Sequence, residues 1–359
     1  MLLSSVRSVL QNRDSRWVMR RLARTPHKLA KLRNLTRLEW ARLRKDPTGG
    51  GGLPIIVSVE PTNACNMKCP MCPTGLDVLS RPKGMMDLDR FAWMLDQIDR
   101  SVLIMSFFMW GEPTLNPRLY DMIRLASRRG IFTLLTINGT RIDAGQILDS
   151  GLDYLVVSFD GTREESYGPV RVGGSLAAAR EGVARLAEER ARRGADRPRI
   201  NMGFIVTKLN EAELPTLGRE AESIGFDAAR PKYLGAMTRK VAAELRPLDP
   251  RLHGSVGWRT LEEGVPGLNL PPILNRCGFL WHSASVHWDG TMVPCCYDWD
   301  AEEPLGNAFR TAFREIWTGA AYTGFRRRVL ADKKSIGLCH ACPGGDIVSF
   351  FSDSFLVRS

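Results

Sequence analysis

Three cysteines lie close together in the first quarter of the chain. Cys65, Cys69 and Cys72 occur in the segment ACNMKCPMCP, and the next cysteine after them is Cys277. A short loop with three thiolates can bind three irons of a [4Fe–4S] cube, and the fourth iron then stays open to a bidentate small molecule. A structural zinc ion would need a fourth ligand close by, usually from paired CxxC units. The spacing therefore favours an iron–sulfur cluster with one open iron over a zinc site.

The other five cysteines occur in the last quarter of the chain, at Cys277, Cys295, Cys296, Cys339 and Cys342. Four thiolates from this set could bind all four irons of a second cube. A CxxC pair with two distant cysteines is also compatible with zinc, so the spacing alone leaves both metals open. Cys296 has three candidate roles: it could replace Cys295 as a ligand, donate a hydrogen atom to a substrate radical, or be a small buried apolar residue.

The segments around the first cysteines alternate between strand-like and helix-like patterns. Apolar, β-branched runs predict six strands, at Ile55–Pro61, Val102–Trp110, Phe132–Gly139, Tyr154–Gly161, Ile200–Asn210 and Ala228–Leu234. Amphipathic segments between them predict helices, for example at Leu88–Ile98, Arg118–Arg129 and Leu176–Arg192. Buried strands that alternate with helices indicate a parallel sheet covered by helices, either doubly wound or a partial (β/α) barrel.

The positions of the polar residues favour the barrel. The three clustered cysteines and the segments GEP, TING and SFDG each follow one of the predicted strands. Barrel enzymes build their active sites from the loops at the carboxyl ends of the strands. We therefore expect an α/β fold with a partial (β/α)6 TIM-like barrel over residues 51–240.

The sequence pattern changes after the sixth predicted strand. We expect a linker over residues 241–270 and then a small α+β domain over residues 271–359. Short alternating strands and an Asp289-Gly290 turn predict a hairpin in this last domain.

Residues 1–50 form a basic arm. This segment contains 13 Lys or Arg and three acidic residues, so it accounts for nearly all of the formal net charge of +11. Its Leu, Val and Trp residues recur at helical spacing, which predicts basic, partly amphipathic helices before the glycine-rich hinge TGGGGLP. Three uses are open: packing on the barrel as a helical lid, contact with anionic lipid at the membrane periphery, or docking of a partner. No aromatic interleaving or nucleic-acid motif favours DNA or RNA.

The chain shows no targeting signal in its sequence pattern. No apolar run reaches the length of a membrane span, and the first residues are too polar for a secretory signal. We therefore expect a cytoplasmic protein, in which clustered cysteines more often serve metal or redox chemistry than disulfides.

CxxxCxxC after the first strand, with Gly111-Glu112-Pro113 after the second, resembles the radical S-adenosylmethionine (SAM) enzymes. The resemblance implies that Cys65, Cys69 and Cys72 hold a [4Fe–4S] cluster whose open iron binds SAM. It also implies that an electron from the cluster cleaves SAM to methionine and a 5′-deoxyadenosyl radical, which abstracts a hydrogen atom from the substrate. An external one-electron reductant of the flavodoxin or ferredoxin type is then an expected partner.

The same resemblance implies a set of contacts to SAM. Gly111, Glu112 and Pro113 would take up the ammonium group, because backbone carbonyls and a carboxylate are acceptors. The other candidates are Ser158 and Asp160 for the ribose, Arg171 for the carboxylate, Met71 for the adenine, and Asn138, which could reach SAM or only shape a turn. The family often has an aromatic residue at the position of Met71, so we expect weaker adenine stacking here.

The carboxyl-terminal segment resembles the SPASM and shorter twitch domains that carry auxiliary clusters in some of these enzymes. The matching residues are Cys277, Cys295, Cys339 and Cys342, which the resemblance assigns to an auxiliary [4Fe–4S] cluster. Because no cysteine follows Cys342, we expect one auxiliary cluster.

The reaction follows from these expectations only in outline. A fully ligated auxiliary cluster cannot bind substrate, so we expect it to accept an electron. We expect oxidation (dehydrogenation) or epimerisation of a small polar molecule, such as an aminocyclitol or sugar derivative, because the arm has no strand pattern for binding a peptide leader. The alternative is a maturase that modifies a ribosomal peptide or a protein side chain. Candidate bases near the sixth strand are Asp227, Arg230, Lys232 and Tyr233.

Overall fold

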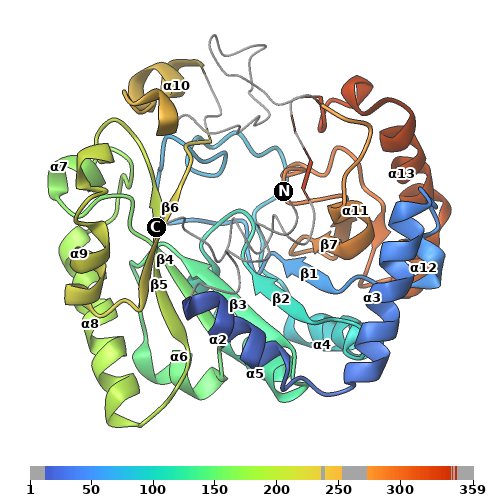
Figure 1. The fold of residues 1–359 in the computed structure, drawn as a ribbon, viewed down its shortest axis with the longest axis horizontal. Helices are drawn as coiled ribbons and strands as arrows, with labels where there is room; N and C mark the ends of the chain where they lie inside the picture. Colours follow the sequence, from blue (N-terminus) through green and yellow to red (C-terminus); the bar gives the residue numbers. More distant parts are fainter. Residues whose placement is uncertain (1–12, 236–238, 253–272, 341, 343, 346–359) are drawn as a thin grey trace.

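One nine-stranded sheet forms the centre of the molecule (Figure 1). The structure, a computed structural model, describes residues 13–235, 239–252, 273–340, 342 and 344–345. The strand order is β6-β5-β4-β3-β2-β1-β7-β8-β9, and the edge strands β6 and β9 do not pair with each other, so the sheet is not closed. The α/β class and the partial, TIM-like barrel predicted from the sequence are confirmed.

Six parallel strands form the barrel part of the sheet. They are β1 (Ile56–Val59), β2 (Ile104–Phe107), β3 (Phe132–Ile137), β4 (Tyr154–Ser158), β5 (Arg199–Ile205) and β6 (Ala228–Lys232). Each strand pairs with the next one along the chain. β2 is buried along its whole length, as expected for a strand that is covered on both faces. All six predicted strands are present.

Helices connect these strands on the outside of the sheet, and one more helix, α10, follows β6 and lies above the strand ends (Figure 1). They are α4 (Leu88–Ile98), α5 (Leu119–Arg128), α6 (Ala144–Ser150), α7 (Glu164–Tyr167), α8 (Leu176–Arg192), α9 (Leu217–Ile224) and α10 (Arg239–Leu245). Short 3₁₀ turns occur at Gly49–Gly51, Pro113–Leu115, Glu211–Glu213, Pro250–Leu252 and Lys333–Ser335. Asp87, Asp143 and Ser175 cap helices by accepting a hydrogen bond from the backbone N–H three residues on.

The carboxyl-terminal strands extend the barrel sheet. β7 (Ser283–Val286) lies parallel to β1, and β8 (Thr291–Val293) and β9 (Gly306–Asn307) follow in antiparallel order. The predicted hairpin at Asp289-Gly290 is present, but its strands do not form a separate small sheet. β7 instead pairs with the free edge of β1, whose main-chain groups would otherwise lack partners. The helices α11 (Phe279–His282), α12 (Phe313–Thr318) and α13 (Ala320–Asp332) accompany these strands.

The predicted linker differs from the structure at its beginning. The boundary expected at residue 240 falls inside α10, which packs Val241 and Leu245 against Met71 and Val170. This helix therefore belongs with the barrel loops. Residues 253–270 of the expected linker lie outside the described residues.

Two helices of the basic arm, α2 (Arg13–Leu22) and α3 (Lys28–Leu43), pack on the barrel. The ring of Trp17 meets Phe132 at the start of β3 with 6.3 Å between centroids, and Arg21 pairs with Asp153 at 2.6 Å just before β4. These contacts place α2 at the amino ends of the strands, opposite to the ends that carry the predicted motifs. No helix within the described ranges is long and apolar enough to cross a membrane.

Candidate iron–sulfur and SAM site

The three-cysteine loop begins directly after β1. Cys69 is buried, and Cys65 and Cys72 are half-buried. Burial raises the pKa of Cys69 to about 11, the charge of Arg171 opposes this shift, and the neighbouring thiols Cys72 and Cys65 add to it. Burial also raises the pKa of Cys65, and the backbone N–H of Met67, 3.4 Å from its sulfur, opposes the shift. The structure thus gathers the three thiols in one partly buried loop.

Gly111 allows the loop after β2 to lie directly on the cysteine loop. Its φ is +106°, and a Cβ atom built on it would lie 2.3 Å from the carbonyl oxygen of Thr62 and 2.8 Å from that of Ala64. The next residue, Glu112, donates its backbone N–H to the Ala64 oxygen at 2.8 Å. Only glycine permits this approach, because any side chain would meet the backbone of the other loop. Pro113 then begins a 3₁₀ turn.

The Glu112 carboxylate is buried and holds several donors. Thr114 donates its hydroxyl at 2.6 Å, and Asn138 donates its backbone N–H at 2.7 Å. Burial raises the pKa of this carboxyl group, and these hydrogen bonds oppose the shift. The side chain of Asn138 is itself engaged: its oxygen accepts from Thr140, and its amide donates to Asn66 at 2.9 Å. In this structure Asn138 therefore shapes the turn after β3 and joins it to the cysteine loop.

Arg171 links the end of β4 to the cysteine loop. Its guanidinium pairs with the buried carboxylate of Asp160 and lies 3.9 Å from the sulfur of Cys69. Burial lowers the pKa of Arg171, but the charges of Asp160 and Cys69 outweigh this effect and raise the pKa overall. Asp160 has a φ of +51° and also accepts the backbone N–H of Ile205 at 2.6 Å. Both oxygens of this carboxylate are thus bound within the protein, whereas the half-buried Ser158 ends β4 beside it.

Met71 lies in a small apolar cluster. It packs with Val170, Val241 and Leu245, and this cluster is separate from the main core. The contact joins the cysteine loop to α10. The structure therefore gives Met71 apolar neighbours from the loops above the sheet, the type of surface on which an adenine ring can lie.

The carboxyl-terminal cysteines also gather in one place. The pKa of Cys295 lies well above its ordinary value because of burial, and the nearby thiols Cys296, Cys342 and Cys277 add to the shift. Burial likewise raises the pKa of Cys339 to about 12, with further contributions from Cys277 and Cys342. Three segments that are distant in the sequence, around Cys277, around Cys295 and around Cys339 and Cys342, thus bring their thiols together. Cys296 is exposed, unlike the buried apolar residue that was one of its candidate roles.

The buried Lys333 contacts the segment that carries two of these thiols. The ammonium group of Lys333 donates to the carbonyl oxygen of Cys342 at 2.7 Å, and its charge lowers the pKa of Cys339 and Cys342 against the effect of burial. The backbone N–H of Gly344 lies 3.3 Å from the Cys342 sulfur. A cation and a directed N–H both stabilise thiolates.

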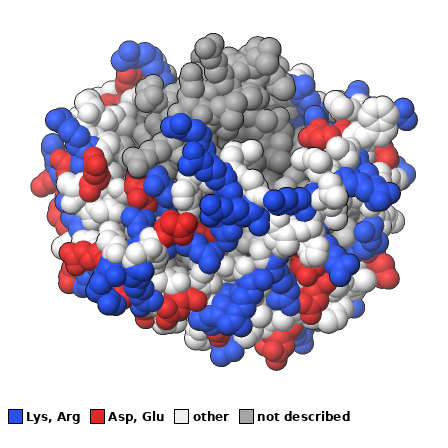
Figure 2. All heavy atoms as spheres, turned by 60° about the horizontal axis from the view of Figure 1, so that its bottom comes forward, with Lys and Arg blue, Asp and Glu red and all other residues white. Residues whose placement is uncertain are grey.

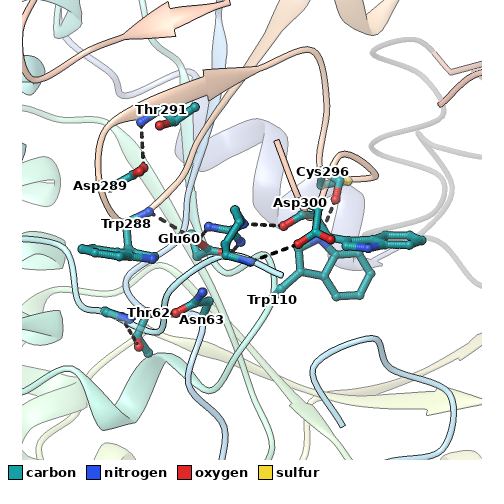
Figure 3. Close-up of polar contacts among 12 residues, drawn as sticks. Glu60, Thr62, Asn63, Trp110, Trp288, Asp289, Thr291, Cys296 and Asp300 are labelled. Atoms are coloured by element: carbon teal, nitrogen blue, oxygen red, sulfur yellow. Dashed lines mark hydrogen bonds and ion pairs between the residues drawn. The ribbon is translucent and has the colours of Figure 1, made fainter. Parts of the chain in front are cut away.

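One tryptophan joins the two cysteine groups. The indole N–H of Trp110 donates to the carbonyl oxygen of Cys296 at 2.6 Å, and its ring meets Trp299 edge-on with 5.8 Å between centroids (Figure 3). Trp110 directly precedes Gly111, so the loop that lies on the first three cysteines also contacts the loop of Cys295. Trp110 was not selected from the sequence. The signal that could have found it was its position directly before Gly111-Glu112-Pro113.

A second connection runs through residues 80–84, whose partners Glu60 and Asp300 are labelled in Figure 3. Arg81 makes a two-pronged ion pair with the buried Glu60, at 2.9 and 3.0 Å, and donates to the carbonyl oxygen of Trp299. Trp288 at the hairpin turn donates its backbone N–H to Glu60 at 3.3 Å. Asp300 accepts the backbone N–H of Ser80 at 2.8 Å. The chain between the first cysteines and α4 is therefore bonded to the carboxyl-terminal hairpin.

The candidate bases near the sixth strand do not form one group. Asp227 lies before β6, at the amino end of the sheet, where it pairs with Arg190 and Arg199. Arg230 is buried and lies over the ring of Tyr154 at 5.3 Å. Only Lys232 and Tyr233 lie exposed at the carboxyl end of β6. Asp227 therefore lies away from the loops that carry the predicted motifs, as its position directly before the predicted strand Ala228–Leu234 implied.

Two families match the chain. Residues 59–217 match the radical SAM superfamily, and residues 277–343 match an iron–sulfur cluster-binding domain of the SPASM type. The chain belongs to the radical SAM superfamily. It is therefore a radical SAM enzyme with a carboxyl-terminal SPASM domain, as the sequence motifs predicted.

Several known proteins are similar to this radical SAM enzyme. A tungsten-containing aldehyde ferredoxin oxidoreductase cofactor-modifying protein of Pyrococcus furiosus is 27% identical over 75% of this chain and 82% of its own length. A PqqA peptide cyclase of Ruegeria pomeroyi is 26% identical over 76% of each chain. The crystal structure of SuiB of Streptococcus suis bound to S-adenosylmethionine has a TM-score of 0.60 at 16% identity, over 84% of this chain and 74% of SuiB.

The two domains imply SAM, a [4Fe–4S] cluster and auxiliary iron–sulfur binding. The structure fits this requirement, because each group contains one buried thiol, Cys69 or Cys339, has a cation beside it and has a backbone N–H directed at a sulfur. Among the residues described, no three His, Cys, Asp or Glu lie close enough to share one metal ion. A cube binds each thiolate to a different iron, so its ligands lie farther apart than those of a single ion.

Proposed function

We propose that this radical SAM enzyme is a maturase that modifies a side chain of a peptide or protein. The observation that supports this proposal is the sequence similarity to peptide-modifying relatives over most of the chain. The PqqA peptide cyclase of Ruegeria pomeroyi matches over 76% of each chain, whereas neither of the two relatives described above is named for oxidation of an aminocyclitol or a sugar. Of our two sequence-based hypotheses, the alternative is therefore the better supported.

The contacts between the two cysteine groups agree with one substrate site served by both. Trp110 joins the loop after β2 to the loop of Cys295, and Arg81 joins the segment after the first cysteines to the hairpin. These bonds keep the two groups at a fixed separation, which electron exchange between them and a substrate would need. We propose a division of the chain into the arm over residues 1–50, a barrel domain from residue 51 that includes α10, and the carboxyl-terminal domain over residues 271–359.

We propose the following roles for the side chains. Cys65, Cys69 and Cys72 bind the cluster with the open iron, and Cys277, Cys295, Cys339 and Cys342 bind the auxiliary cluster. Gly111, Glu112, Pro113, Ser158, Asp160, Arg171, Met71 and Asn138 surround SAM, with Glu112 and Asn138 acting through the shape of the loops. When bound, the cluster and SAM supply a 5′-deoxyadenosyl radical that removes a hydrogen atom from the substrate. An external one-electron reductant completes the system.

Hydrogen transfer from the substrate provides the test. The reconstituted enzyme with SAM and dithionite is incubated with proteins and peptides extracted from cells grown on deuterated amino acids. We expect deuterium in the 5′-deoxyadenosine that forms, because the radical takes its hydrogen atom from an amino-acid residue. The Cys65→Ala variant is the control and should form no 5′-deoxyadenosine. A parallel incubation contains deuterated sugars and other small metabolites in place of the proteins and peptides. Deuterium in the 5′-deoxyadenosine of this incubation alone would refute the maturase and restore the small-molecule hypothesis.

A further inference from the structure

The outward face of α3 carries a stripe of large apolar side chains. Leu29, Leu32, Trp40 and Leu43 are 84%, 57%, 59% and 67% exposed. At 100° for each residue, these four positions lie within about 80° of one another around the helix. They span 14 positions, which is about 21 Å along the axis. The exposed Thr36 lies between the pair Leu29 and Leu32 and the pair Trp40 and Leu43. Large apolar side chains that gather on one exposed face often mark a binding surface.

The inward face of α3 already fixes this helix on the protein. Leu38 and Ala41 are buried, and Asn34 exchanges two hydrogen bonds with the backbone of Leu53, at 2.6 and 2.9 Å. Glu39 pairs with the buried His282 of α11 at 2.9 Å. The position of the helix therefore does not depend on the outward stripe, and the fold of the described residues does not explain it.

Basic side chains border this apolar stripe. Arg33, Arg37 and Arg44 are exposed along one side of it. The guanidinium carbon of Arg44 lies 4.3 Å from the ring centroid of Trp40. None of the three arginines has an acidic partner within the part of the chain that the structure describes. Lys and Arg also gather in patches on the molecular face in Figure 2, with Asp and Glu scattered between them.

We propose that α3 docks the protein on an anionic lipid surface, with the apolar stripe among the headgroups and the arginines against the lipid phosphates. A helix that lies in a bilayer interface has Leu and Trp on one face and Lys or Arg beside them. Tryptophan favours the headgroup region, and anionic lipids attract basic side chains. A second copy of this chain fits less well, because it would bring two sets of unpaired arginines together. The proposal does not depend on the proposed maturase activity.

Vesicle sedimentation with the full chain tests this proposal. We expect binding to vesicles of phosphatidylcholine with phosphatidylglycerol, weakening at high salt, and little binding to phosphatidylcholine alone. The variant L32S/W40S/L43S should partition at least about tenfold more weakly, because it removes the buried apolar contacts. The variant R33Q/R37Q/R44Q should lose about fivefold in affinity for each arginine.

The matched control W93S/L248S changes two apolar residues that are exposed elsewhere, and it should bind like the wild type. All three variants should cleave SAM at the wild-type rate, because none of the substituted residues belongs to the proposed cluster or SAM sites. Absence of binding to the anionic vesicles at low salt, or equal binding by the wild type and the stripe variant, would overturn the proposal. A dimer in light scattering that the stripe variant abolishes would assign the face to a second copy and also overturn it.

Discussion

At the residue scale, the candidate site depends on how closely two loops approach each other. The carbonyl oxygens of Thr62 and Ala64 face the α-carbon of Gly111, so the loop after β2 rests on the backbone of the cysteine loop. This contact fixes Glu112 relative to Cys65 without any side chain between the loops. The GEP motif, whose contacts to SAM are our proposal, is therefore also a packing requirement of the two loops.

Replacement of Gly111 by alanine should separate the loops. The new Cβ would lie 2.3 Å from the Thr62 oxygen, and the φ of +106° is strained for alanine by about 1–3 kcal/mol. We expect SAM cleavage to fall at least tenfold, on the order of 1.4 kcal/mol or more in the barrier, as measured by 5′-deoxyadenosine formation. In the control Gly218→Ala, no atom lies within 4 Å of the new Cβ, so activity should not change.

Arg171 should tune the first cluster through its charge. It lies 3.9 Å from the Cys69 sulfur, and a nearby positive charge favours the reduced, more negative state of a cluster. We expect Arg171→Met to lower the midpoint potential on the order of tens of millivolts, measured by redox titration with electron paramagnetic resonance. The exposed Arg163→Met is the control. An unchanged potential in the Arg171 variant would show that the guanidinium does not act on the cluster.

At the element scale, the segment Ser80–Gly84 holds the carboxyl-terminal hairpin against the barrel. Its central contact is the Arg81–Glu60 ion pair, with side chains that are 9% and 0% exposed. Breaking a buried pair on one side leaves an uncompensated charge. Lys83, two positions along, pairs with Asp77 instead on the surface, where both side chains are more than 60% exposed. The same segment thus contains a buried pair and an exposed one.

These two pairs allow a matched comparison. Arg81→Met should lower the free energy of unfolding by about 3–5 kcal/mol, whereas Lys83→Met should change it by less than about 1 kcal/mol. Denaturant unfolding of the reconstituted protein measures both. Equal effects of the two variants would contradict the role of the Arg81 bridge.

The loss in the Arg81 variant should depend on pH. Burial raises the pKa of Glu60 and Arg81 lowers it again, so removal of Arg81 raises it further. The folded state then binds more protons than the unfolded state between the two pKa values of Glu60, so stability falls as pH rises through that window. We therefore expect Arg81→Met to be more stable at mildly acidic than at neutral pH, relative to the wild type. If the stability that Arg81→Met loses relative to the wild type did not change with pH, this would argue against a buried charge on Glu60.

At the scale of the whole molecule, the sequence predicted the elements better than their long-range pairing. The apolar runs located all six barrel strands, and the amphipathic patterns predicted the bounds of α4 and α8. The cysteine spacing predicted both families that match the chain. These features are local, because strand burial, helix periodicity and ligand spacing are each written in a short segment.

Features that depend on distant segments were not predicted. The pairing of β7 with β1 joins residues that are more than 200 positions apart, and no local pattern encodes it. The contact of Trp110 with Cys296 and the placement of α2 at the amino ends of the strands are of the same kind. The expectation of a small-molecule substrate relied on the absence of a peptide-binding pattern from the arm. The similarity to a peptide cyclase is stronger evidence than that absence, so it favours the alternative.

The free energy of unfolding should also depend on pH through Lys31, a buried residue of the basic arm. Burial lowers the pKa of Lys31 to about 8, against the opposing charge of Asp99. Between this value and the ordinary pKa of 10.5 the unfolded state binds more protons, so stability should rise with pH across that window. Lys31→Met should stabilise the protein at pH 7 by about 1–3 kcal/mol and remove the rise. Thermal unfolding of the wild type and the variant at several pH values measures both effects. A Lys31→Met variant that is less stable than the wild type at pH 7 would contradict them.

Mössbauer spectroscopy of the protein reconstituted with ⁵⁷Fe tests the central claim, that one cluster is open to SAM and the other is closed by the protein. We expect about eight irons for each chain and about four in either Cys65→Ala/Cys69→Ala/Cys72→Ala or Cys339→Ala/Cys342→Ala. Added SAM should change the signal of one iron in the wild type and in the second variant, and of none in the first. About four irons in the wild type, or a SAM response that persists without the first three cysteines, would contradict the claim.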